Sequence, residues 1–79
     1  MIDFPTMLFA YSSAIQCALM AGNDRSTLKK CNELLHHFCK SLVETSQESD
    51  NTKSKMKADL EMQKEIHDWE IDRYFGNGS

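Results

Sequence analysis

The sequence predicts an all-α fold, either a small three-helix bundle or a helical hairpin with a third helix against it. Residues 28–43 place apolar side chains at alternating spacings of three and four, which is the period of one helix face. One Pro and three Gly are too few for an all-β domain rich in turns. The 79 residues predict one domain over residues 1–75, followed by a flexible tail over 76–79.

The first helix is expected over residues 4–21. Asp3 or Thr6 can cap its N-terminus, and Pro5 suits its first turn. Gly22 favours its end. Its apolar side chains gather on one face, which predicts a largely buried helix. They are Phe4, Met7, Leu8, Tyr11, Ala14, Ile15, Ala18 and Leu19.

A membrane or signal-peptide alternative arises because residues 4–23 carry no charged side chain. However, no Lys or Arg precedes this stretch, and Asp3 has the wrong sign for a signal peptide. Ser12, Ser13 and Gln16 interrupt the apolar run, whereas a spanning helix requires about 20 more uniformly apolar residues. The sequence therefore favours a buried helix over membrane association.

The second helix is expected over residues 25–45, with Asp24 or Ser26 as its cap. Its apolar stripe consists of Leu28, Cys31, Leu35, Phe38 and Leu42, widened by Leu34, Cys39 and Val43. The other side, expected to be solvated, carries Lys29, Lys30, Glu33, His36, His37 and Lys40. This pattern is typical of a helix that packs against other helices.

Residues 46–54 contain no apolar side chain, and we expect them to form a polar loop. The alternative is one continuous helix from Asp24 to Tyr74, because no Gly or Pro breaks the segment. The loop is favoured because Ser, Asp and Asn side chains compete with the helix for backbone hydrogen bonds. A third helix should then follow over residues 53–74. Its candidate caps are Asp50, Asn51 and Thr52.

The third helix has two apolar stripes instead of one. The first consists of Met56, Leu60, Ile71 and Tyr74, and the second of Ala58, Met62, Ile66 and Trp69. A terminal helix in a three-helix monomer needs only one such stripe. The excess apolar surface predicts a homo-oligomer.

The candidate partner-binding residues lie on this third helix. Met62, Ile66 and Trp69 are expected to form the apolar part of an interface, because Met and Trp are enriched in interface cores. Simple burial within the monomer would explain them equally well. An acidic stripe beside them is either a solvated face or a docking rim for a basic partner. It consists of Glu61, Glu65, Asp68 and Asp72.

No metal, cofactor or catalytic site is expected. Cys31 and Cys39 are eight residues apart, about 12 Å along a helix, which does not suit a zinc site. Together with Cys17 they lie in or beside apolar stripes, where a thiol stays protonated and inert. The histidines, including His67, are expected to be solvated. Three cysteines without a CxxC motif favour a reduced, cytoplasmic location.

The charge distribution restricts the kind of partner. The net charge is −3, with +1 in residues 1–43 and −4 in residues 44–79, which argues against direct binding of nucleic acid. We therefore expect a non-enzymatic protein–protein interaction module, such as an adaptor, chaperone or inhibitor. The alternatives are a purely structural homo-oligomer and a small acidic inhibitor that occupies the nucleic-acid-binding groove of a partner protein.

Overall fold

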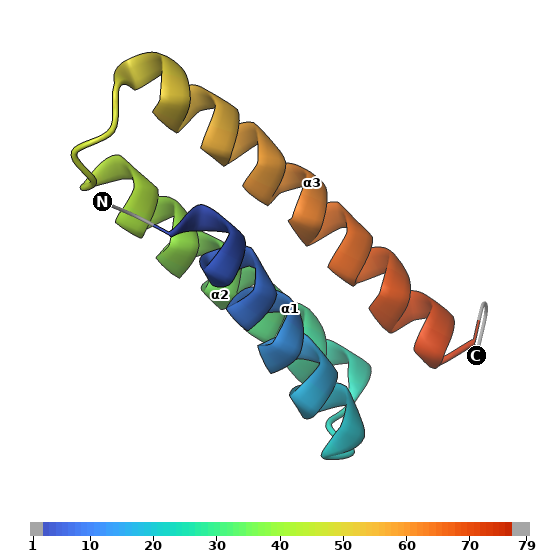
Figure 1. Ribbon diagram of the computed structural model, residues 1–79. Helices are drawn as coiled ribbons and strands as arrows, with labels where there is room; N and C mark the ends of the chain where they lie inside the picture. The colour runs from blue at the N-terminus through green and yellow to red at the C-terminus, as the bar shows by residue number, and fades with distance from the viewer. Residues whose placement is uncertain (1–2, 77–79) are drawn as a thin grey trace.

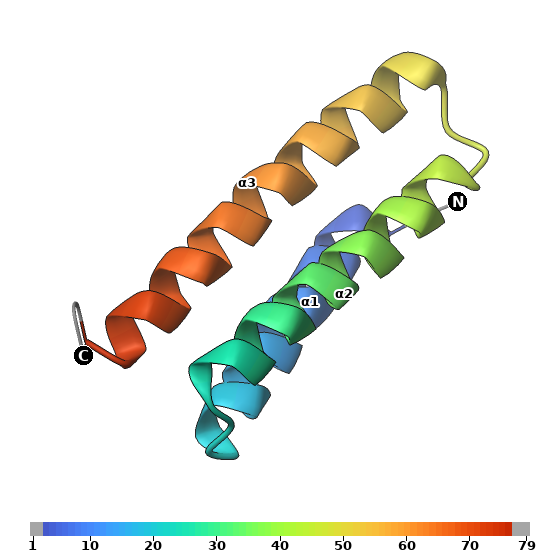
Figure 2. The same cartoon turned by 180° about the vertical axis from the view of Figure 1, so that it is seen from behind.

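The computed structural model describes residues 3–76, which contain three helices and no strand. The helices are α1 (Phe4–Met20), α2 (Arg25–Glu44) and α3 (Asp50–Tyr74). Neighbours in the chain run antiparallel, so α1 and α3 point the same way, and each helix contacts the other two (Figure 1). Seen from behind, α2 lies in front of α1, with α3 along their side (Figure 2). The expected all-α fold of three packed helices is confirmed.

The first two helices begin at acidic caps. The Asp3 carboxylate accepts a hydrogen bond of 3.3 Å from the Thr6 backbone N–H, and Asp24 accepts one of 2.7 Å from Thr27. The bonds from Thr27 stabilise the charged form of Asp24 and lower the pKa of its carboxyl group. The turn between α1 and α2 passes through Gly22, whose φ of +85° favours glycine.

The connection between α2 and α3 is shorter than expected. Ser49 is the N-cap of α3, because its hydroxyl accepts a hydrogen bond of 3.2 Å from the Thr52 backbone N–H. The helix therefore begins at Asp50, three residues before the expected start at residue 53. The chain reverses over residues 45–49, which excludes the alternative of one continuous helix. Of the expected tail over 76–79, all but residue 76 lies outside the part of the chain that the structure describes.

The hydrophobic core is thin and draws on all three helices. Its buried members are Tyr11, Ile15, Leu19, Leu28, Cys39, Val43, Leu60 and Ile71. The first helix supplies three of these residues and so forms one wall of the core. Among residues 3–76, no helix is both long and apolar enough to cross a membrane.

The buried face of α2 differs from the predicted stripe. It consists of Leu28, Asn32, His36, Cys39 and Val43. The helix is rotated so that its polar side packs against α3 while Leu34 and Phe38 remain exposed. The prediction of solvated histidines was wrong for His36 and His67, which are only 8% and 2% exposed. Of the three cysteines expected in or beside apolar stripes, only Cys39 is buried, whereas Cys31 is half-buried and Cys17 is exposed.

Candidate functional site

A buried polar network centred on Asn32 joins the three helices. The Tyr11 hydroxyl of α1 donates to the Asn32 side-chain oxygen and lies 3.1 Å from the Asn32 backbone carbonyl. The Asn32 amide nitrogen donates to the Lys64 carbonyl at 2.9 Å and to an Asp68 carboxylate oxygen at 2.8 Å, both on α3. Asn32 is fully buried and its side chain has partners on both neighbouring helices. Such a satisfied network specifies one packing of the bundle.

Basic side chains of α2 extend this network toward the surface. Lys29 Nζ lies 3.0 Å from an Asp72 carboxylate oxygen and 3.7 Å from one of Asp68. Arg25 Nε lies 3.5 Å from the other Asp72 oxygen. These side chains are about one-third to one-half exposed, so each ion pair contributes only about 0–1 kcal/mol. These ion pairs hold Asp68 and Asp72 of α3 against α2.

His67 occupies an enclosed site between α1 and α3. Its Nε2 lies 3.0 Å from the Ser12 hydroxyl, and its ring meets the Tyr11 ring edge-on with centroids 4.4 Å apart. Its buried Nδ1 has no hydrogen-bond partner among residues 3–76. Burial lowers the pKa of His67, and the negative charges of Glu70 and Asp68 offset only part of this effect. The ring is therefore held in its neutral form.

Two buried titratable groups of this region, Tyr11 and Cys39, have raised pKa values. Burial raises the pKa of Tyr11 far above neutral pH, and the carboxylates of Asp68 and Glu61 add to this effect. Burial also raises the pKa of the Cys39 thiol. Both groups stay protonated, and a protonated thiol is a poor nucleophile. Among the residues from Asp3 to Gly76, no group of three His, Cys, Asp or Glu side chains is placed to hold a metal ion. The hydrogen bonds of Asn32 hold the three helices together.

The apolar side chains predicted to bind a partner lie together on the outer surface of α3. Met62, Ile66 and Trp69 are 58%, 42% and 58% exposed and form one line along the helix, called here the α3 stripe. The Arg73 guanidinium stacks over the Trp69 ring, 5.1 Å from its centroid. The hypothesis that these residues pack inside the monomer was wrong. The other predicted stripe supplies Leu60 and Ile71 to the core, whereas its Tyr74 is exposed.

The four acidic candidates have different surroundings. Asp68 and Asp72 are paired with α2, as described above, and Glu61 Oε1 lies 3.0 Å from His36 Nε2. Glu65 is exposed and makes no ion pair within residues 3–76. It follows Met62 by three residues and precedes Ile66, so it lies at the edge of the α3 stripe. Among these four carboxylates, Glu65 alone lacks a contact with a basic side chain within residues 3–76, and it lies exposed beside that stripe.

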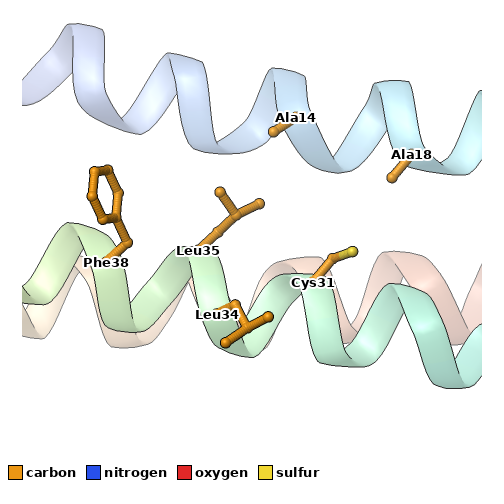
Figure 3. A pocket seen from close by; sticks show the side chains of 6 residues that line it. All are labelled: Ala14, Ala18, Cys31, Leu34, Leu35 and Phe38. Carbon is orange, nitrogen blue, oxygen red and sulfur yellow. The ribbon is translucent and has the colours of Figure 1, made fainter.

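A second apolar surface, which the sequence reasoning missed, lies between α1 and α2 and is called here the α1/α2 groove. It is an open hollow of about 440 Å³. Its lining residues are Ala14, Ala18, Cys31, Leu34, Leu35 and Phe38. Figure 3 shows the short alanines on α1 above the longer side chains of α2, with α3 behind α2. One available signal was the α2 stripe, which is wider than the contact with a single helix requires.

Comparison of the chain with protein-family models, curated proteins and solved structures yields no match. Inference of function therefore depends on the chain's own residues and their arrangement.

Proposed function

We propose that the chain is a non-enzymatic protein–protein interaction module that binds another protein through the α3 stripe. The observation that carries the proposal is the exposure of Met62, Ile66 and Trp69 on one line of a helix whose opposite face is buried. An exposed line of apolar side chains at spacings of four and three is the pattern with which a helix enters a partner's groove. Trp69 serves as the anchor, because Trp is enriched among residues that dominate binding energy.

The partner offers an apolar groove with a basic rim. Glu65 lies beside the stripe, exposed and without an ion pair among residues 3–76. Such charges accelerate encounter with an oppositely charged partner more than they add affinity. The contacts of Asp68 and Asp72 with Lys29 weaken the alternative of an inhibitor that imitates nucleic acid, because these carboxylates are already neutralised. We further propose a reducing, cytoplasmic location, which the three free cysteines support.

Affinity capture from the cells that encode the chain tests this function. Three baits are compared: the parent, Trp69→Ala, and Phe9→Ala as a control, since Phe9 is 73% exposed on α1. We expect one protein to be retained by the parent and the control, and retained about 30-fold less by Trp69→Ala, as for a binding hot spot. Retention of the same proteins by all three baits would contradict the proposal.

A stability measurement accompanies the capture, because loss of binding must not reflect unfolding. Trp69 is 58% exposed and is not part of the hydrophobic core. Trp69→Ala should therefore change the free energy of unfolding by less than about 1 kcal/mol. Urea unfolding followed by circular dichroism provides this value. A much larger loss of stability would mean that Trp69 supports the fold.

A further inference from the structure

The α1/α2 groove is lined by apolar side chains without charge. No charged residue occurs from Phe4 to Met20, and Leu34 and Phe38 of α2 are 63% and 61% exposed. The groove between the helices is lined by uncharged residues (Figure 3). In that view α3 lies behind α2, and the α3 stripe lies on the side of α3 opposite its buried residues, so the two surfaces are separate. Contiguous exposed apolar surface of this kind marks an interaction site.

This face combines large and small apolar side chains. The large side chains Leu34 and Phe38 of α2, 63% and 61% exposed, line the hollow together with the short Ala14 and Ala18 of α1 (Figure 3). In a two-fold arrangement, Leu34 and Phe38 of one copy can pack against Ala14 and Ala18 of the other, and the reverse contact then forms at the same time. This reciprocity is the requirement for a closed symmetric dimer.

We infer that a second copy of this chain covers the α1/α2 groove. The two copies pack their α1 and α2 helices against each other, with the two α3 helices on the outside. The α3 stripe stays exposed in this dimer, so the inference goes beyond the proposed function and does not depend on it.

Charge supports a second copy as the occupant. Each copy carries a net charge of −3, so two copies repel unless their meeting surfaces are free of like charges. The α1 side of the groove has no charged side chain, and the groove residues on α2 have none either. Lys30 lies one turn before Leu34 at the exposed outer side of α2, where its long side chain can stay in water. A basic or acidic partner would find no countercharge along α1.

The size of the face also suits a dimer. A helix of 17 residues such as α1 is about 26 Å long, and two helices side by side are about 20 Å wide. The flat area is therefore about 500 Å² before surface relief is counted, close to the roughly 600 Å² per partner at the lower end of stable interfaces. Dimerisation would also add apolar contacts to a chain whose own core is thin.

Analytical ultracentrifugation of the purified chain over a dilution series tests the dimer. The parent should reach twice the 9.1 kDa mass of one chain and dissociate on dilution. Leu34→Glu and Phe38→Glu should each weaken the dimer about 30-fold or more, as for residues at the centre of an interface. Met62→Glu and Trp69→Glu are the matched controls, with similar exposure on the α3 stripe, and should leave the dimer intact. Circular dichroism should show unchanged helix content in all four variants.

Cysteine alkylation gives a second readout on the unmodified chain. Cys31 lines the groove, whereas Cys39 is buried within one copy. Protection of Cys31 should therefore rise with protein concentration, and protection of Cys39 should not depend on it. A parent chain that stays monomeric, with Cys31 equally reactive at all concentrations, would overturn the inference and leave the groove to a different protein. A dimer dissolved by the α3 variants but not by the α2 variants, or open-ended assembly, would overturn it as well.

Discussion

The side-chain amide of Asn32 on α2 donates a hydrogen bond of 2.8 Å to the Asp68 carboxylate on α3. The side-chain oxygen of Asn32 accepts a hydrogen bond from the Tyr11 hydroxyl on α1, so one buried residue links all three helices. A single buried asparagine can fix the register of packed helices in this way, at some expense of stability relative to an apolar residue. The exposed apolar surfaces keep their relative positions because the network beneath them is fixed.

Replacing Asn32 should destabilise the chain severely. Asn32→Ala leaves the buried Tyr11 hydroxyl without its side-chain acceptor and Asp68 without its amide donor, at a cost of about 2–4 kcal/mol in the free energy of unfolding. Urea unfolding provides the measurement, and Glu33→Ala, an exposed neighbour, is the control, expected within about 0.5 kcal/mol of the parent. If both variants unfold at the same urea concentration, the network does not hold the helices together.

Two acidic residues of α3 should respond differently to charge reversal. Asp68→Lys removes the contacts with Asn32 and Lys29 and places two cations together, so it should lower the free energy of unfolding by about 2 kcal/mol or more. Glu65→Lys acts at an exposed position and should change it by no more than about 0.5 kcal/mol. Thermal unfolding of the two variants makes the comparison. Equal stability of the two variants would show that the contacts of Asp68 with Asn32 and Lys29 do not stabilise the fold.

Acidification should destabilise the chain through His67. Its folded pKa is lowered from 6.5, so below that pH the unfolded chain binds the additional proton. Stability is therefore full above the unfolded pKa and falls as the pH drops through it, by at most about 1.4 kcal/mol per pH unit for this one group. His67→Gln keeps a neutral polar side chain and should remove this component, although it lowers stability at neutral pH. Unfolding curves measured between neutral pH and mild acid decide the matter, and parallel losses in both proteins would exclude His67 as the source.

The cysteines should differ in their reaction with an alkylating reagent. Cys17 is exposed and should react at once in the folded chain, whereas Cys39 is 4% exposed and its thiol pKa is raised by burial. Mass spectrometry of partially alkylated protein, with and without denaturant, assigns the sites. Rapid alkylation of Cys39 in the absence of denaturant would mean that the α1–α2–α3 core opens readily.

The local features of the fold could be predicted from the sequence. The caps at Asp3 and Asp24 and the turn at Gly22 depend on residues a few positions away, so their signals lie within one short window. The start of α3 was placed too late because Ser49, and not a residue of the following turn, supplies the capping oxygen.

The buried polar residues could not be predicted in this way. Asn32, His36 and His67 are polar, and they become buried only because partners from other helices satisfy or enclose them. The apolar stripe of α2 is wide enough to allow several rotations, and the network with α3 selects the rotation that leaves Phe38 outside. By contrast, the two apolar stripes of α3 indicated that one of them would be exposed, because one helix rarely buries both of its sides. Trp69 belongs to the exposed stripe.

Site-specific photo-crosslinking from the α3 stripe is the most direct test of the proposal that this surface binds another protein. A photoreactive amino acid replaces Ile66, which lies between Met62 and Trp69, and a parallel strain carries it in place of the exposed Phe9. After irradiation of the cells that encode the chain, position 66 should give one discrete product that contains a different protein, and position 9 should not. If position 66 yields no product beyond that from position 9, or only a second copy of this chain, the α3 stripe is not the partner-binding surface.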